Sequence, residues 1–172
     1  MSVTIYPKAT TMYKPKKCYN GYTLFPLSLI DMNGRVINEW NLDSLRIKAK
    51  PGARARLLKN GHVVALRGAM MSKDGGVQEY DWDSRLVWEY SPSSGYLGPH
   101  HDVFRKTNGN TLLICREAVP EEYMKEVTEP KFRNITVYGD AILEVTSDSK
   151  VVWEWHGYEH LDLNHNSRCS WV

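Results

Sequence analysis

A repeated hairpin unit constrains the fold of this chain more than any other feature of the sequence. Each copy has an apolar strand, a polar turn and a second strand that ends in Glu beside an aromatic residue. Glu39, Glu89 and Glu154 mark the same phase in the three copies, with spacings of 50 and 65 residues. The first copy turns at Asn33-Gly34, a strong hairpin signal because both residues tolerate positive φ. These patterns predict antiparallel β-structure.

A second hairpin type alternates with the first. Residues 55–66 form one copy and residues 102–115 form the other, and each turns at an Asn-Gly pair. Together the two types give four strands in a period of about 45 residues, which is typical of β-propeller blades. The one segment with helical character is 120–127, and it explains the wider second spacing. We therefore predict an all-β chain that forms about three four-stranded propeller blades.

Three blades are too few for a closed ring, because closed propellers have at least about four. The chain also stops within an apolar segment, at Trp171-Val172. We therefore expect a fragment or one half of a split propeller, completed by a second chain that is a C-terminal half or another copy. Residues 1–18 are expected to form an N-terminal arm or leading strand, and residues 19–172 the partial propeller.

The composition excludes several classes of protein. The net charge of +2 gives no basic field for nucleic acid, and no apolar run is long enough to span a membrane. The first 25 residues lack the apolar segment of a signal peptide. Three cysteines without CxxC spacing indicate neither a disulfide framework nor a zinc knuckle. We therefore expect a cytoplasmic protein without a cofactor.

The tryptophans also follow the repeats. Trp40, Trp88 and Trp153 occur once in each copy of the first hairpin type. A platform for carbohydrate or aromatic ligands is one interpretation. Recurrence in every repeat favours packing between blades instead, because neighbouring repeats stack on one another.

Several motifs occur in an order that resembles one family. The first is His101-Asp102-Val103, and the last is His165-Asn166-Ser167. Between them lie the phrases 108–113, 139–145 and 151–155. This ordered set is similar to the arylsulfotransferase family of β-propellers, over the chain from about Tyr19 to its end.

The resemblance implies a six-bladed propeller with a central site. It implies transfer of a sulfuryl group from one phenol ester to another phenol, without a nucleotide donor. The family uses several histidines and an arginine, and one histidine is transiently sulfated. His101 and His165 match two of the family's histidine positions. The sulfated histidine and the arginine belong to later blades, so a completing half is expected to supply them.

The chemistry of the transfer gives each candidate residue a role. Histidine can act as a nucleophile, as an acid or base and as a donor to oxygens near neutral pH. His101 and His165 are therefore the candidate catalytic residues, as stabilisers of the sulfuryl oxygens or the leaving phenolate. The candidate substrate-binding residues are Asp102, Arg116 and Asn166.

Each of these assignments has an alternative. Asp102 either fixes the tautomer of an imidazole or closes its loop by accepting backbone N–H groups. Arg116 either faces the channel or forms an ion pair with Glu117. His100 is expected to point away from its neighbour, because successive side chains alternate in extended backbone, and to have a structural role.

Two rival functions stay open. His156, His160, His165 and Cys169 are spaced by four, five and four residues and offer ligands for zinc or another transition metal. No helix is predicted to align them. The other rival is a non-catalytic propeller used for binding or assembly, so the chain is a transferase only if the ring is completed. Its expected small-molecule partner is a phenolic or other aromatic sulfate.

Overall fold

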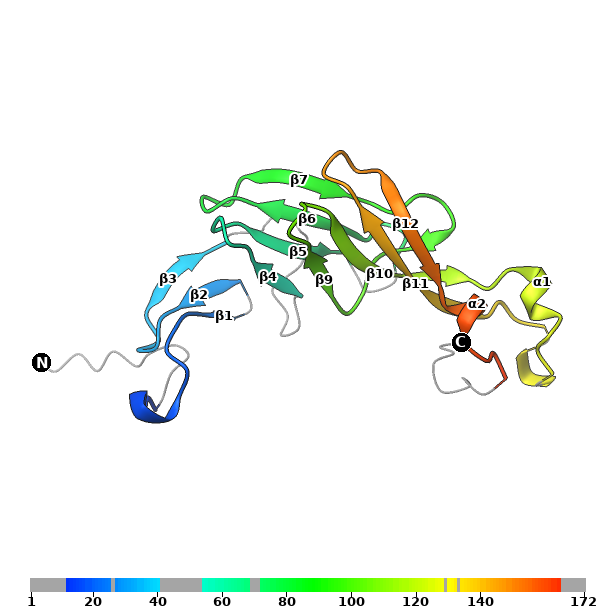
Figure 1. The fold of residues 1–172 in the computed structure, drawn as a ribbon, viewed down its shortest axis with the longest axis horizontal. Coiled ribbons are helices and arrows are strands. Elements are labelled where there is room, and N and C mark those ends of the chain that lie inside the picture. Colours follow the sequence, from blue (N-terminus) through cyan, green and yellow to red (C-terminus); the bar gives the residue numbers. More distant parts are fainter. Residues whose placement is uncertain are drawn as a thin grey trace, which may run out of the picture.

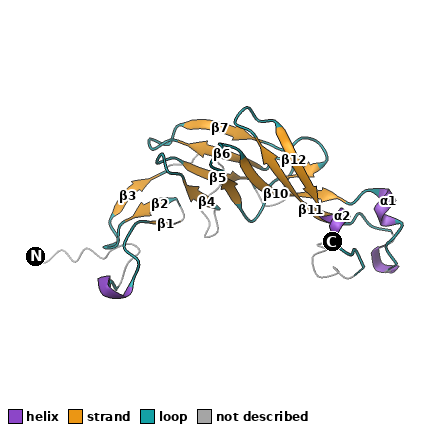
Figure 2. Ribbon diagram, viewed as in Figure 1, coloured by secondary structure: helices purple, strands orange, loops and turns teal. Residues whose placement is uncertain are grey.

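The computed structural model of the chain describes residues 12–25, 27–40, 54–68, 72–128, 130–132 and 134–164. These residues form three antiparallel sheets that follow one another along the chain, in an arc from blue to orange (Figure 1; Figure 2). The all-β prediction is confirmed. The sheets do not close on themselves within the described part of the chain.

The first sheet has three strands, β1 (Thr23–Phe25), β2 (Ser28–Ile30) and β3 (Val36–Glu39). It is preceded by a short 3₁₀ turn, η1 (Pro15–Lys17). The second sheet has four strands in sequential order: β4 (Ala55–Leu57), β5 (Val63–Arg67), β6 (Gly76–Tyr80) and β7 (Leu86–Tyr90). Most of the expected arm, residues 1–11, lies outside the described residues.

The third sheet carries five strands. They are β8 (Tyr96–Leu97), β9 (Val103–Arg105), β10 (Thr111–Ala118), β11 (Tyr138–Val145) and β12 (Val151–His156). Both β8 and β9 pair with β10, so together they form one interrupted edge strand. Two short helical segments, α1 (Glu121–Met124) and η3 (Pro130–Phe132), lie between β10 and β11, and α2 (Gly157–His160) follows β12. The helix expected over 120–127 is present as the single turn α1.

Two apolar layers join the three sheets. Leu27, Leu29 and Trp40 of the first sheet pack against Val63 and Tyr80 of the second, and all five are buried. A larger layer joins the second sheet to the third. Its buried residues are Val64, Leu66, Val77, Tyr90, Val103, Leu113, Cys115, Ala141, Leu143 and Val145. The second sheet is therefore covered on both faces, and burial of apolar surface is the main force that holds the arc together.

The strand registers confirm the phase of the repeated Glu residues and correct that of the tryptophans. Glu39 pairs with Ser28, and Glu89 pairs with Gln78, at equivalent places in the two sheets. Trp40 follows its Glu, whereas Trp88 and Trp153 precede theirs. Trp40 therefore corresponds to Tyr90 and Trp155, so the expected register was wrong for Trp40.

The tryptophans also differ in their packing. Trp40 is buried, meets the Trp82 ring edge-on with 5.8 Å between ring centroids, and donates through Nε1 to the Asp81 carbonyl. Trp88 packs against the layer between the second and third sheets. Trp153 is 48% exposed. Packing between sheets is thus confirmed for Trp40 and Trp88, whereas no other sheet of the described residues covers Trp153.

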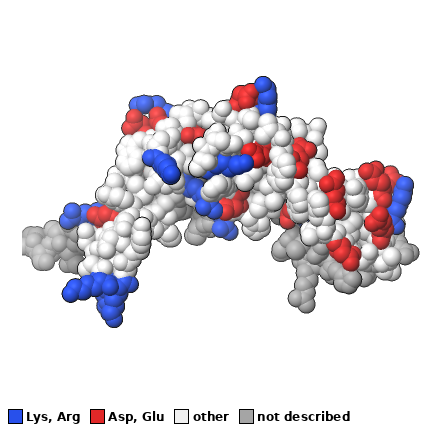
Figure 3. Space-filling model, viewed as in Figure 1, with Lys and Arg blue, Asp and Glu red and all other residues white. Residues whose placement is uncertain are grey.

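Charge is unevenly distributed over the face of the molecule shown in Figure 3. Acidic side chains gather at the end that carries α1 and α2, and basic side chains gather at the opposite end, near η1. Within the described residues, no helix has the length and apolar composition needed to cross a bilayer.

Candidate functional site

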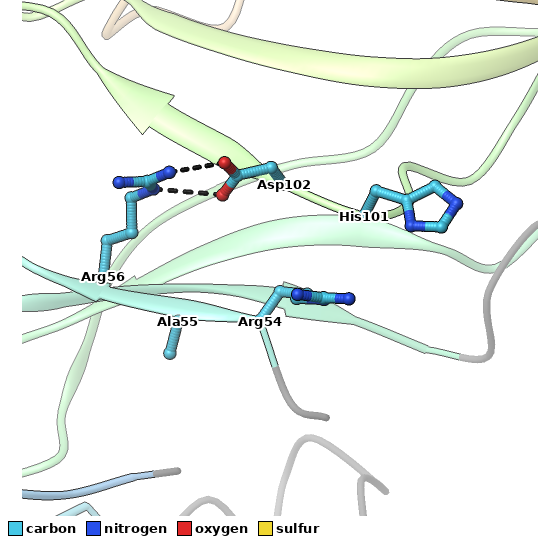
Figure 4. Close-up of a pocket in the computed structure, with 5 residues that line it drawn as sticks. All are labelled: Arg54, Ala55, Arg56, His101 and Asp102. Carbon is cyan, nitrogen blue, oxygen red and sulfur yellow. Dashed lines mark hydrogen bonds and ion pairs between the residues drawn. The ribbon is translucent and has the colours of Figure 1, made fainter. Parts of the chain in front are cut away.

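An open pocket of about 510 Å³ lies where the edges of the second and third sheets meet. Arg54, Ala55 and Arg56 line it from the β4 segment, and His101 and Asp102 line it from the break between β8 and β9 (Figure 4). His101 and Asp102 are two of the site residues that the sequence predicts. The structure brings them together with two arginines from the preceding sheet.

Strand geometry places the two arginines in the pocket. Successive side chains of a strand point to opposite faces, so residues 54 and 56 share a side. Figure 4 shows the Arg54 and Arg56 side chains on one side of the backbone and Ala55 directed away from them. The Arg54 carbonyl accepts a hydrogen bond from Leu66 N–H, which holds this edge against β5.

The break between β8 and β9 is held against the second sheet by two glycines. A Cβ added to Gly98 would lie 2.5 Å from the Cα of Gly75. Gly98 N–H also donates to the carbonyl of Ser72 at 2.8 Å. Only glycine allows two backbones to approach so closely. This contact therefore fixes the position of the backbone that leads into His100 and His101.

His101 adopts a left-handed backbone conformation, with φ of 62°. The conformation is uncommon for a residue with a side chain and costs about 1–2 kcal/mol. His101 is the central residue of a tight turn in which Asp102 N–H donates to the His100 carbonyl at 2.7 Å. The turn interrupts the edge strand and leaves His101 exposed at the pocket.

Asp102 is held by Arg56 rather than by an imidazole. The Arg56 guanidinium donates to both carboxylate oxygens, at 3.0 Å from Nε to Oδ1 and through Nη2 to Oδ2. Val103 N–H donates to the same Oδ1 at 2.9 Å. The Arg56 hydrogen bonds lower the pKa of Asp102 and raise that of Arg56. The hydrogen bond from Val103 N–H is the contact expected if Asp102 closes its own loop, which was one of the two alternatives for this residue.

His100 precedes His101 in the chain and is buried, with 4% of its surface exposed. Its ring meets that of His101 edge-on, with 5.0 Å between the centroids, and its Nε2 lies 3.2 Å from Oδ1 of Asp140. Neither ring nitrogen has an aligned hydrogen bond within the described residues. His100 lowers the pKa of Asp140, with smaller contributions from Arg116 and His101.

Arg116 is buried on β10, with its guanidinium 5.2 Å from the centre of the Tyr138 ring. Glu117 pairs with His156 instead, with 2.9 Å between its Oε2 and Nδ1 of His156. The expected ion pair between Arg116 and Glu117 was therefore wrong, because neighbouring side chains in a strand face opposite ways.

The Glu117–His156 pair lies at the acidic end of the molecule. Burial raises the pKa of Glu117, His156 acts against this shift, and the charges of Glu154 and Glu159 add to it. His160 stacks on Trp155, with ring centroids 5.1 Å apart. No cluster of three or more potential metal ligands exists among the described residues. His165, Asn166 and Cys169 lie outside them, so the metal site stays a hypothesis.

Comparison with protein families decides between the candidate identities. The family described as Arylsulfotransferase (ASST) matches residues 18–171, which is most of the chain. This chain belongs to the arylsulfotransferase family. A search among curated proteins finds no match. The resemblance based on the His-Asp and His-Asn-Ser motifs is therefore confirmed, and the family supports an arylsulfotransferase-like function.

Sequence reasoning missed three residues of this arylsulfotransferase chain. Arg54 and Arg56 line the pocket, and Asp140 lies against the buried His100. The alternation Arg-x-Arg just before an Asn-Gly hairpin was the available signal, since it places two cations on one side of an edge strand. No local sequence pattern indicated Asp140, because this residue comes close to His100 only when β11 pairs with β10 in the folded sheet.

Proposed function

We propose that this chain contributes part of the site of an arylsulfotransferase that moves a sulfuryl group between phenolic compounds without a nucleotide donor. The ring is a six-bladed propeller, and a second chain completes it. The family match over residues 18–171 supports the reaction class. The single structural observation that carries the proposal is the pocket, which joins His101 to two arginines between adjacent sheets.

The charges of the pocket suit an aryl sulfate, which carries one negative charge. Arg54 and Arg56 bring two positive charges, and Asp102 offsets one of them. The remaining positive charge attracts the sulfate group. Guanidinium groups also match its oxygens well, because their planar donors can bind two oxygens at once.

In the proposed reaction the bond between sulfur and the donor phenolate oxygen breaks, and a bond from sulfur to a histidine nitrogen forms. The acceptor phenol then attacks sulfur and gives its proton to a histidine that acts as a base, while the bond between sulfur and the carrier histidine breaks. His101 and His165 donate hydrogen bonds to the sulfuryl oxygens or to the leaving phenolate, which bear the developing charge. The histidine that carries the sulfuryl group comes from the completing part of the ring.

The residues around the histidines hold the substrate in this proposal. Asp102 accepts from Nε and Nη2 of Arg56 and so holds this guanidinium in place at the wall of the pocket, which reduces the freedom that substrate binding must remove. Arg116 adds a positive charge near Asp140, which His100 also approaches. Asn166 contributes an amide donor.

A transfer assay tests the proposal. The protein is incubated with 4-nitrophenyl sulfate and phenol, without any nucleotide, and release of 4-nitrophenolate is followed by absorbance. We expect release that depends on phenol and that yields phenyl sulfate. No release from a preparation in which the ring is closed overturns the enzyme proposal and leaves the non-catalytic binding or assembly propeller.

A further inference from the structure

His100 is a buried histidine whose imidazole does not serve stability in an obvious way. The residue is 4% exposed, yet neither Nδ1 nor Nε2 has an aligned hydrogen bond within the described residues. A buried polar group without such a bond destabilises the folded state, and an apolar side chain of similar shape avoids that cost. The imidazole of His100 therefore calls for an explanation other than stability.

The imidazoles of His100 and His101 are in contact, although successive side chains of a strand point to opposite faces. Their ring centroids lie 5.0 Å apart, with the planes at 85°. The left-handed backbone of His101, with φ of 62°, turns the chain between them and breaks the alternation. The expectation that His100 points away from its neighbour was therefore wrong. Strained conformations of this kind collect at functional sites, and here the strain brings two imidazoles together.

Asp140 of β11 is the ionic partner of the His100 ring. Its Oδ1 lies 3.2 Å from Nε2 of His100, and it stands opposite Arg116 in the ladder. His100 lowers the pKa of Asp140 most, and Arg116 and His101 lower it further, so this carboxyl group is ionised near neutral pH. A charged carboxylate favours a proton on the ring nitrogen that faces it, and this assigns Nε2 of His100 as a donor.

Asp102 does not orient the ring of His101. Figure 4 shows the Asp102 carboxylate directed to Arg56, whereas the His101 ring extends the other way along the same wall of the pocket. The His101 side chain is exposed, so it has rotational freedom that a reaction must remove. Contact with a buried ring that is itself held by a carboxylate removes part of that freedom before the substrate arrives.

We propose that His100 and Asp140 form a positioning pair for His101 in the transfer reaction. Asp140 holds the His100 ring through Nε2, and the buried His100 ring holds the imidazole of His101 at the wall of the pocket. The pair acts through His101 and does not itself touch the substrate. The inference rests on the proposed function for the role of His101, and it adds two residues to which that function assigns no role.

Replacing His100 by phenylalanine separates positioning from stability. Phenylalanine keeps a ring beside His101, but Asp140 has no nitrogen to hold. Because His100→Phe also removes two buried nitrogens that lack aligned hydrogen bonds, we expect the urea midpoint of the full chain to stay the same or rise. A lower midpoint shows that the imidazole serves the fold and counts against the proposal.

Transfer from 4-nitrophenyl sulfate to phenol is measured with the completing part of the ring present. His100→Phe and Asp140→Ala are each expected to lower kcat about tenfold with little change in KM, because a displaced His101 disturbs the reacting geometry more than binding. The double variant also loses about tenfold rather than about a hundredfold, since both changes release the same ring. An unchanged kcat in either single variant, or additive losses in the double variant, overturns the pair.

Asp148→Ala is the matched control for the loss of a carboxylate. Asp148 lies in the turn between β11 and β12, and its side chain is 59% exposed, against 57% for Asp140. It also forms an ion pair, at 2.7 Å from Nζ of Lys150, but it contacts no histidine of the pocket. Asp148→Ala is expected to have the kcat of the wild type. An equal fall in Asp140→Ala and Asp148→Ala shows a general effect of charge and overturns the proposal.

Nuclear magnetic resonance of the full chain reads the contact without any transfer. Cross-peaks between the ring protons of His100 and His101 are expected in the wild type and in Asp148→Ala, and they are lost in Asp140→Ala. Their absence from the wild type, or their survival in Asp140→Ala, overturns the proposal. Absence of transfer by the wild type, with the expected pattern of cross-peaks, counts against the proposed function and leaves the contact of the pair supported.

Discussion

At the scale of single residues, the site depends on a histidine in a strained conformation and on an arginine held by a carboxylate. His101 has positive φ and stands at the break in the edge strand of the third sheet. Arg56 comes from the neighbouring sheet and binds Asp102, 46 residues further along the chain. The proposed function assigns these two side chains separate roles, so substitutions can separate them.

Replacing His101 by glycine separates its chemistry from its strain. Because glycine tolerates positive φ, His101→Gly is expected to be more stable than His101→Ala by about 1 kcal/mol. Both variants lose the imidazole, and transfer falls by about 10²-fold or more if it stabilises the developing charge. Urea unfolding and the transfer assay measure the two effects. Full transfer by either variant removes His101 from the site.

Replacing Arg56 tests the anion site of the pocket. Arg56→Ala removes one guanidinium and leaves Asp102 with its charge unpaired, so we expect binding of phenyl sulfate to weaken by about tenfold or more. Titration calorimetry measures the change. Arg85→Ala is the control, because Arg85 forms exposed ion pairs with Asp81 and Asp83 and does not line the pocket. Equal weakening by both variants would mean that general charge, not the pocket, binds the anion.

At the scale of elements, the break between β8 and β9 is fixed by contact with the loop before β6. Gly75 and Gly98 touch through their backbones, and Ser72 accepts the Gly98 N–H. At the other end of the third sheet, Glu117 of β10 reaches across β11 to His156 of β12.

The glycine contact gives a prediction about stability. Gly98→Ala places a methyl group where backbone atoms of Gly75 and Ser72 already lie, and overpacking of this kind costs about 1–3 kcal/mol. Gly139→Ala is the control, since its new methyl group meets only Val119, at 3.8 Å. Denaturant unfolding of both variants checks the difference. An unchanged Gly98→Ala variant contradicts the assigned role of this contact.

Glu117 gives a prediction about pH. Its pKa is raised in the folded chain, mainly by burial, so the native state holds the proton more tightly than the unfolded state does. The contribution of Glu117 to stability is therefore greatest below its unfolded pKa of 4.5 and declines as pH rises through the raised value. The Glu117→Gln variant lacks this decline.

Glu144 supplies a control of opposite sign for the pH experiment. Lys106 and Asn110 lower the pKa of Glu144 through hydrogen bonds. Its contribution is present above its unfolded pKa and is lost as pH falls through the lowered value. Urea unfolding of the wild-type chain and of both Gln variants between about pH 3 and pH 7 tests the two signs. The same pH slope in all three proteins refutes both assignments.

At the scale of the whole molecule, sequence periodicity was enough to predict the sheets but not their junctions. Alternating runs and Asn-Gly turns are local signals, so the hairpins and the phase of Glu39, Glu89 and Glu154 could be found. Trp40 was placed out of register because an aromatic residue stands on one side of Glu39 but on both sides of Glu89. Only the pairing of the strands shows that Trp40 corresponds to Tyr90 and not to Trp88.

The candidate site was predictable in part for the same reason. His101 and Asp102 stand in a local motif at the start of a hairpin. Arg56 reaches Asp102 only because the third sheet packs on the second and brings β9 beside β4, and no local pattern encodes that contact. Burial of His100 against Asp140 likewise depends on β11 lying beside β10. Residues joined by packing between elements therefore required the structure.

Transfer activity measured across sedimentation fractions tests the central claim most directly. Each fraction of the wild-type chain is assayed for phenol-dependent release of 4-nitrophenolate from 4-nitrophenyl sulfate, with His101→Gly fractionated in parallel. We expect transfer in fractions in which the completing part of the ring accompanies this chain, little in those that hold this chain alone, and little in any His101→Gly fraction. Closed-ring fractions without transfer, or with transfer that His101→Gly retains in full, would contradict the account.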